Sequence, residues 1–328
     1  MKRIYWIMLF SVVIVFGSNY TIVRIGILYS SPLAFSVLRV AGACLVATPF
    51  SAYAAWKIHK KNRAKLEKEE SSPLLPVGKK MFGIIALYGT TSSTFFFGFW
   101  FTGEALTSAS VSAVIVNTIP LFTVLLTRFF LQERMNRKQM LGLVLGFTGA
   151  FTVASNGSIY NLYGDWRGFA FLFLSAASSA TSLIIYKRSL AHYEQNTVNA
   201  LQLFFAAIGL FVWAVASNPH SFETIIWTNQ TFQEAVLYSA LTATPVNLIW
   251  MALIRQMGPA WFSTWLFLNP VSAVIISSLV LGERLLELQL VGMALVVFSI
   301  YQINRARLIN ETGGVGSAAS YRKTLPDG

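Results

Sequence analysis

Long apolar segments, interrupted by short polar ones, account for most of this chain. A helix needs about 20 mostly apolar residues to cross a bilayer. Inside a bilayer only helices or closed barrels satisfy every backbone polar group, and these segments are too long and continuous for barrel strands. We therefore predict an all-α integral membrane protein with ten transmembrane helices: Ile4–Leu28, Leu33–Trp56, Met81–Thr102, Ser108–Phe130, Gln139–Ser155, Gly168–Tyr186, Thr197–Ser217, Ala235–Ile254, Pro259–Leu281 and Leu288–Ile303.

One stretch of this pattern occurs twice, at a constant offset of 150 residues. The first copy lies between Ala109 and Gly142, and the second lies between Pro259 and Gly292. Six residue types recur at matching positions: Pro120 and Pro270, Leu131 and Leu281, Glu133 and Glu283, Arg134 and Arg284, Gln139 and Gln289, and Gly142 and Gly292. Because chance rarely preserves so many pairs without a gap, we infer an internal duplication that makes two related halves.

The duplication divides the chain into two repeats of five helices, residues 1–156 and 157–308. Within the first repeat, residues 57–80 are charged and contain two prolines, which indicates a partly helical cytoplasmic linker. Residues 309–328 include a Gly-rich run at 313–317, so we expect a disordered cytoplasmic tail there.

The composition agrees with a membrane protein. Hydrophobic residues make up 55% of the chain, charged residues 12%, and the mean hydropathy is +0.58. Soluble domains carry about 25% charged residues, so this chain lacks the charge to cover a soluble surface. The net charge of +12 does not indicate nucleic-acid binding, because the Lys and Arg residues cluster in short stretches between apolar segments.

Several kinds of chemistry have no support in the sequence. Cys44 is the only cysteine, and the three histidines (His59, His192 and His220) lie in loops, so we expect no disulfide and no metal site. The chain has no GxxxxGK[ST] phosphate loop, and no His, Ser-Lys or paired Asp constellation lies within a span. We therefore predict no cofactor, no catalytic residue and no enzymatic activity.

The basic residues also predict the orientation. With the N-terminus in the cytoplasm and ten spans, 20 of the 25 Lys and Arg residues fall in cytoplasmic segments. Arg167 and Arg284 fall outside, and the other three, Arg24, Arg39 and Arg128, lie within spans. Since cytoplasmic loops of membrane proteins are rich in Lys and Arg, both termini are expected in the cytoplasm.

This orientation gives the two repeats opposite topologies. Glu133-Arg134 follows the fourth span on the cytoplasmic side, whereas Glu283-Arg284 follows the ninth span on the outer side. Inverted repeats are typical of secondary transporters, which bind substrate near the membrane midplane between the repeats. The pattern therefore favours a transporter that works by alternating access.

Three groups of residues resemble a known family: Phe16-Gly17-Ser18-Asn19-Tyr20 in span one, Pro32-Leu33-Ala34-Phe35 leading to Arg39 in span two, and the doubled stretch. They look like the EamA-type permeases of the drug/metabolite transporter superfamily, over nearly all of residues 4–303. The resemblance implies carrier-mediated transport, often export, of small metabolites such as amino acids, and we expect the cell membrane as its location. Nucleotide-sugar or organophosphate exchange stays open, as does a non-transporting receptor or scaffold. Oligomeric state also stays open.

Arg24 and Arg39 are the first candidates for substrate contact. They flank the turn between spans one and two, about 9–12 Å into their helices. Ionisable groups within a membrane are costly, so the pair is a candidate site for a carboxylate or phosphate. The alternative is that both side chains reach to the membrane surface and only position their helices.

Other candidates are polar, aromatic or helix-breaking residues within the spans. Four amides, Asn19, Asn117, Asn247 and Asn269, either bond across helices or face a wet cavity, and Trp265 is the aromatic candidate for a cavity wall. Pro120 and Pro270 are candidate hinges. The pairs Glu133-Arg134 and Glu283-Arg284 either anchor helix ends or act as gates on opposite faces.

Overall fold

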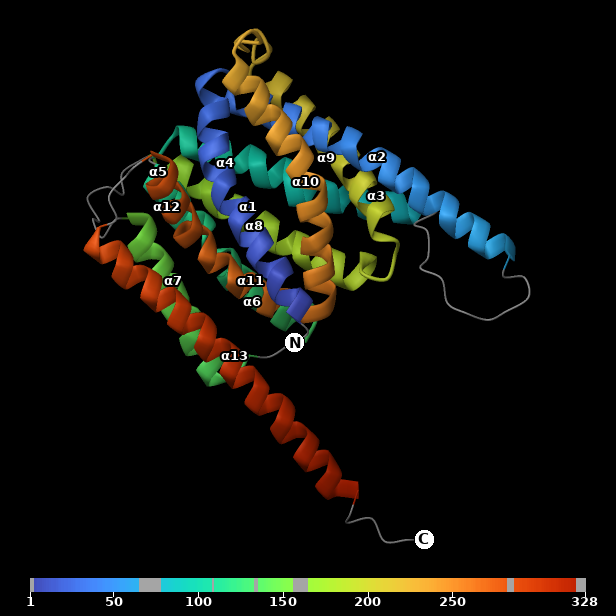
Figure 1. Cartoon of the computed structure of the whole chain (residues 1–328), viewed down its shortest axis with the longest axis vertical. Helices are drawn as coiled ribbons and strands as arrows, with labels where there is room; N and C mark the ends of the chain where they lie inside the picture. Colours follow the sequence, from blue (N-terminus) through green and yellow to red (C-terminus); the bar gives the residue numbers. More distant parts are fainter. Residues whose placement is uncertain are drawn as a thin grey trace.

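The computed structural model describes residues 3–64, 78–107, 109–132, 135–155, 165–281 and 286–322, and over these residues the chain forms helices joined by short turns (Figure 1). Eight helical stretches within this part are long and apolar enough to cross a membrane, and Ile4–Asn19 is a shorter apolar helix. The all-helical, membrane-spanning architecture expected from the hydrophobic pattern is therefore confirmed.

The helices follow the apolar segments in order. Those of the first half are α1 (Arg3–Leu28), α2 (Pro32–Ala64), α3 (Lys79–Gly89), the π-helix η1 (Thr90–Phe95), α4 (Phe96–Ala105), α5 (Ala109–Val116), α6 (Ile119–Phe130) and α7 (Arg137–Ser155). Those of the second half are α8 (Trp166–Ile185), the π-helix η3 (Tyr186–Leu190), α9 (Gln195–Ser217), α10 (Gln230–Met257), α11 (Pro259–Thr264), the 3₁₀-helix η4 (Trp265–Phe267), α12 (Leu268–Leu281) and α13 (Glu287–Arg322).

Two helices extend beyond the expected spans. The backbone of α2 stays helical to Ala64, inside the segment predicted as a linker. The backbone of α13 stays helical to Arg322, where we expected a disordered tail from residue 309 (Figure 1).

The duplicated glutamines begin the last helix of each half. In α7, Gln139 Oε1 accepts a hydrogen bond from Asn136 N, and Gln139 N donates to Asn136 Oδ1, both at 2.8 Å. This reciprocal arrangement is a capping box, which satisfies backbone groups that the first turn leaves without partners. In α13, Gln289 Oε1 accepts from Leu286 N at 3.1 Å.

The two halves pack against each other through equivalent helices. The final helices α7 and α13 run side by side, and the second spans α2 and α9 do the same (Figure 1). The first span α1 packs on α10 and α12 of the second half, while α8, the corresponding first span, packs on α4 and α6 of the first half. Each half thus supplies the same elements to the other.

Matching positions meet along the pair α7 and α13. A Cβ atom added to Gly149 would lie 2.8 Å from the carbonyl oxygen of Gly292, and one added to Gly292 would lie 2.9 Å from that of Gly149. Near the other end, Ser299 Oγ donates to the carbonyl of Gly142 at 2.6 Å. Because Gly292 and Ser299 each lie 150 residues after Gly142 and Gly149, the two contacts join the same pair of positions with the halves exchanged. Small residues here let the two backbones approach closely.

A second exchanged pair joins the third span of each half to the second span of the other. Thr94 Oγ1 in η1 donates to the carbonyl of Ala206 in α9 at 3.3 Å. Thr244 Oγ1 in α10 donates to the carbonyl of Ala43 in α2 at 2.9 Å. Thr244 lies 150 residues after Thr94, and Ala206 lies 163 residues after Ala43. The change in offset falls between the second and third spans, where the first half has the longer connection.

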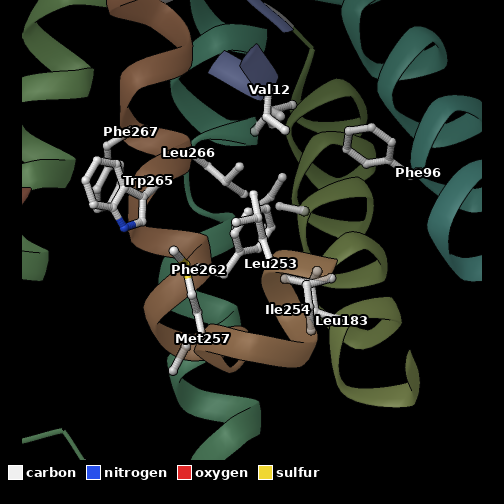
Figure 2. Close-up of a cluster of buried hydrophobic side chains, with 14 of the residues drawn as sticks. Val12, Phe96, Leu183, Leu253, Ile254, Met257, Phe262, Trp265, Leu266 and Phe267 are labelled. Atoms are coloured by element: carbon white, nitrogen blue, oxygen red, sulfur yellow. The ribbon is translucent and has the colours of Figure 1, made fainter. Parts of the chain in front are cut away.

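The largest of three buried hydrophobic clusters among the described residues joins the two halves at the centre of the bundle. Figure 2 shows Val12 and Phe96 of the first half converging on Leu253, Phe262 and other side chains of the second half. The core therefore depends on both repeats being present, and neither repeat buries its apolar surface alone.

Candidate functional site

The fourth and ninth spans are interrupted at corresponding places. Span four breaks at Asn117 and Thr118, between α5 and α6. Span nine passes through the 3₁₀-helix η4 between α11 and α12. Pro120 lies in the first turn of α6, and Pro270 is the third residue of α12. Since proline lacks an amide N–H and crowds the preceding turn, the duplicated prolines account for two breaks at equivalent positions.

The polar groups at the break in span four bond to their own helix. Asn117 N and Nδ2 both donate to the carbonyl of Ala113, at 3.3 and 2.6 Å. Thr118 Oγ1 donates to the carbonyl of Ile115 at 2.6 Å. The amide nitrogen of Asn117 therefore satisfies a carbonyl at the end of α5.

The break in span nine leaves polar atoms without partners. Asn269 Oδ1 and Trp265 Nε1 are buried and have no hydrogen-bond partner among the described residues. The Trp265 ring packs edge-on against Trp6 at a centroid distance of 5.3 Å, inside the core and beside Phe267 in Figure 2. A buried polar atom without a partner costs about 1–3 kcal/mol, so both atoms stay candidates for ligand contact.

Asn19 and Asn247 lie on the two helices that pack beside each other, α1 and α10. Asn19 Oδ1 is buried and lacks a partner in the described part of the chain. Asn247 is half-buried, and no hydrogen bond joins its side chain to another described residue. Ser18, next to Asn19, and Tyr238 of α10 are hydrogen-bonded to each other at 2.6 Å, which ties α1 to α10.

Arg39 lies inside the bundle. Its side chain is 8% exposed, and it is the only buried cation among the described Lys and Arg side chains. The guanidinium carbon lies 4.9 Å from the centre of the Phe97 ring, a cation–π contact, and no described acid pairs with it. Arg39 is therefore enclosed by the helix bundle, which disfavours a role limited to positioning its helix at the membrane surface. The side chain of Arg24 lies outside the described part of the structure.

Arg39 begins a strip of side chains that the sequence did not single out. Phe97 stacks on Trp100 and Phe101, at centroid distances of 6.4 and 5.9 Å. One turn further along α4 lies Glu104, whose Oε2 accepts a hydrogen bond from Ser112 Oγ at 3.0 Å. The spacing 97, 100, 101, 104 places these four residues on one helix face, and this spacing is the feature of the sequence from which the strip could have been predicted. Glu104 was not a candidate in the sequence because it follows the end of the third predicted span, away from the midplane.

The corresponding place in the second half is neutral. Gln202 of α9 lies 163 residues after Arg39 and, like it, is buried. Its Oε1 accepts from Ser92 Oγ at 3.0 Å, and its Nε2 donates to Asn199 Oδ1 at 3.3 Å. Asn199 Nδ2 is buried without a partner within the described chain. This second polar cluster therefore offers amide groups where the first offers a charge.

The candidate gate residues are not among those that the structure describes. Glu133, Arg134, Glu283 and Arg284 lie outside the described residues. Among the residues that are described, no group of three or more His, Cys, Asp or Glu side chains is arranged to hold a metal ion.

The fold and site define an all-helical membrane protein with two interlocked halves, paired helix breaks and a buried cation. The chain belongs to the EamA-like transporter family, whose model matches residues 3–155 and 166–305. These two segments coincide with the two halves, and the family resemblance seen in the sequence is confirmed. The protein is therefore a membrane transporter of a small molecule, and not an enzyme.

Curated relatives match most of the chain. The "Probable amino-acid metabolite efflux pump" of Salmonella typhimurium is 26% identical over 297 residues, which cover 88% of this chain and 91% of the relative. An uncharacterized inner membrane transporter of Escherichia coli, YedA, is 24% identical, with 92% and 90% covered. A crystal structure at 14% identity aligns with a TM-score of 0.73, covering 94% of this chain and 99% of that one, which supports the fold.

Proposed function

We propose that this protein is a secondary transporter that moves a small carboxylate-bearing metabolite, such as an amino acid, out of the cell by alternating access. In this proposal ten helices cross the cell membrane, both termini lie in the cytoplasm, and the two five-helix repeats have opposite orientations. Substrate binds between the repeats, near the helix breaks. The name of the Salmonella relative supports both the substrate class and the direction.

Two observations support inverted repeats. The distribution of basic residues favours an odd number of spans per half, which turns the second repeat over. The exchanged contacts, Thr94 with Ala206 and Thr244 with Ala43, are those expected when the halves are related by a two-fold axis. In transporters of this kind such an axis lies in the membrane plane.

The paired helix breaks support the alternating-access step. Interrupted helices at corresponding positions of two repeats are typical of substrate sites in secondary transporters. Pro120 and Pro270 then serve as hinges at which α6 and α12 change direction relative to α5 and α11. Gate roles for Glu133-Arg134 and Glu283-Arg284 would follow on opposite faces of the membrane.

The observation that carries the proposal is the buried guanidinium of Arg39, with which no described acid pairs. A charge within a membrane protein is costly unless another charge compensates it, and Phe97 supplies only the face of a ring. A bound carboxylate would accept two parallel hydrogen bonds from the guanidinium. A single buried cation suits one carboxylate better than a doubly charged phosphate, so organophosphate exchange has less support.

Counterflow into proteoliposomes tests this function. Purified protein is reconstituted with an internal pool of amino acids, other carboxylates or organophosphates, and entry of the labelled solute is measured. We expect counterflow of at least one carboxylate, and a loss of tenfold or more in Arg39→Gln. Arg128→Gln, which changes an exposed arginine in α6, is the matched control and should keep full activity. Binding without flux would instead favour a receptor, and counterflow restricted to organophosphates would favour the exchanger.

A further inference from the structure

We propose that Glu104, Ser112 and Trp100 form a second charged subsite, which binds the amine of the substrate while Arg39 binds its carboxylate. The preferred ligand is then an extended zwitterion, with an apolar or aromatic body that lies along the rings of α4 between the two charges. This inference rests on the proposed transport function and specifies the substrate class.

The strip on α4 has a charge at each end. Arg39 from α2 covers the first ring, Phe97, and Glu104 occupies the same helix face seven residues further on. Phe97, Trp100 and Phe101 lie between them on this helix face, and the planes of these three rings are inclined to one another by only 15–24°. Aromatic faces accept both apolar chains and cations, so the strip suits a molecule with an amine and an apolar body.

Neutral donors position the carboxylate at the far end. Ser112 Oγ donates to Glu104 Oε2 at 3.0 Å and also accepts from Trp100 Nε1 at 2.7 Å. Ser112 itself is 2% exposed, while Trp100 and Glu104 are half-buried, so this chain of bonds leads from the protein interior toward its edge. Among described residues, no cation lies within ion-pair distance of Glu104. The Glu104 carboxyl group is thus oriented by neutral donors and has no cationic partner among the described residues, which leaves it available to an ammonium group.

A role in helix stability does not explain Glu104. It lies in the last turn of α4, where the helix dipole places partial negative charge and disfavours a carboxylate. Two charged residues at the start of α8, which packs on α4, are engaged elsewhere. Asp165 caps α8 by accepting from Arg167 N, and the Arg167 guanidinium lies over Trp166. An acid kept in an electrostatically unfavourable position indicates a ligand.

The length of the strip sets the size of the ligand. Seven residues of α-helix advance about 10 Å, which separates the Glu104 end from the Phe97 end. An α-amino acid carries its two charges on one carbon and reaches only one end at a time. A dipeptide spans about 7 Å between its termini, and the flexible side chains of Arg39 and Glu104 cover the remainder. A dipeptide or an ω-amino acid therefore fits better.

The test is counterflow with ligands that lack one charge. Wild-type protein should transport 6-aminohexanoate at least tenfold better than its N-acetyl form or its amide. Glu104→Gln should abolish the preference over the N-acetyl form and keep the preference over the amide, while Arg39→Gln should do the reverse. Ser112→Ala should weaken the amine preference about threefold. Glu234→Gln, at an exposed acid at the start of α10, is the control.

Each outcome decides one proposal. If wild-type protein moves no solute, the transport function fails. If it transports carboxylates but Glu104→Gln and Ser112→Ala keep the full amine preference, the second subsite is overturned and the transport function stands. A preference for leucine over 6-aminohexanoate in the wild type would also overturn the extended ligand. Ser112→Ala keeps the test decisive if Glu104→Gln fails to accumulate in the membrane.

Discussion

The two halves share their scaffold contacts but differ where they present charge. The pairs Gly149 with Gly292 and Ser299 with Gly142 occupy exchanged positions, as do the two threonine-to-carbonyl bonds. In contrast, Arg39 of α2 has Gln202 as its counterpart in α9. The duplication thus preserved contacts made to the backbone and diverged at a side chain that has no backbone partner.

This difference shows which positions hold the bundle together. Every exchanged contact uses a glycine, serine or threonine against a carbonyl, so it fixes the distance between two helices and tolerates little change. Arg39 and Gln202 have different neighbours. Arg39 contacts the aromatic ring of Phe97, whereas Gln202 is hydrogen-bonded to the hydroxyl of Ser92 and the side-chain amide of Asn199. The contacts that set helix geometry are thus shared by both halves, whereas the buried charge of Arg39 has the neutral Gln202 as its counterpart in the other half.

The largest expected effect comes from breaking the shared scaffold. Gly149→Leu and Gly292→Leu each push a side chain against a backbone carbonyl, and overpacking of this kind costs about 1–3 kcal/mol or more. Both variants should lose several degrees of melting temperature in detergent, by similar amounts.

The matched control is Gly83→Leu, because a Cβ atom there meets nothing within 4 Å. It should melt at or above the wild-type temperature, since leucine favours helix more than glycine does. The double variant at Gly149 and Gly292 should lose less than the two single losses combined, because the residues face each other. A loss in the double variant as large as the two single losses combined would contradict a direct contact between the two positions.

Exchanging the unequal pair gives the next largest effect. Arg39→Gln removes a charged hydrogen bond to a carboxylate, worth about 1.5–3 kcal/mol, so counterflow should fall about 10- to 100-fold. The exchange variant Arg39→Gln with Gln202→Arg restores the charge but places it beside Ser92 and Asn199, away from Phe97. We expect no recovery in the exchange variant. Full recovery in the same assay would show that the two positions are functionally equivalent.

Removing the two threonine hydrogen bonds between the halves tests the same comparison with a smaller expected loss of stability. Thr94→Val and Thr244→Val each remove one hydrogen bond between halves, which is worth about 0.5–1.5 kcal/mol. Thermal unfolding should detect similar losses, with the larger one at Thr244 because its bond is shorter, 2.9 against 3.3 Å. Thr152→Val is the control, since that exposed threonine bonds only to its own helix. A loss at one site alone would argue against a two-fold relation.

Much of this architecture follows from local signals in the sequence. The apolar segments and the 150-residue offset predicted the helices and the halves, because span length and duplication leave marks along the chain. Arg39 was also a candidate from the sequence, since any charge within an apolar segment is conspicuous, but the sequence left open whether its side chain is buried or reaches the membrane surface. Gln139 and Gln289 were noticed, but their role depends on hydrogen bonds at the helix starts.

Other features depend on which helices become neighbours. The importance of Glu104 arises from Ser112 of α5 and from the ring stack that leads to Arg39, and neither contact is visible before the helices are packed. Asn117 looked equivalent to Asn269 as a ligand candidate. The structure engages the first amide with Ala113 and leaves Asn269 Oδ1 without a partner among the described residues, a distinction set by the local geometry of each break.

The smallest expected effect comes from a substitution that makes the starts of the last helices of the two halves more alike. The capping box of α7 is reciprocal, whereas in α13 the bond from Leu286 N to the Gln289 side chain has no reciprocal side-chain bond, because leucine offers no side-chain acceptor and Gln289 N donates to the Leu286 carbonyl instead. Leu286→Asn should complete the second box and stabilise the protein by about 0.5–1 kcal/mol. Little apolar burial is lost, since Leu286 is 46% exposed. Leu286→Ala is the control, because it removes the leucine side chain without adding a cap. If the asparagine variant is no more stable than the alanine variant, the two helix starts differ in backbone geometry.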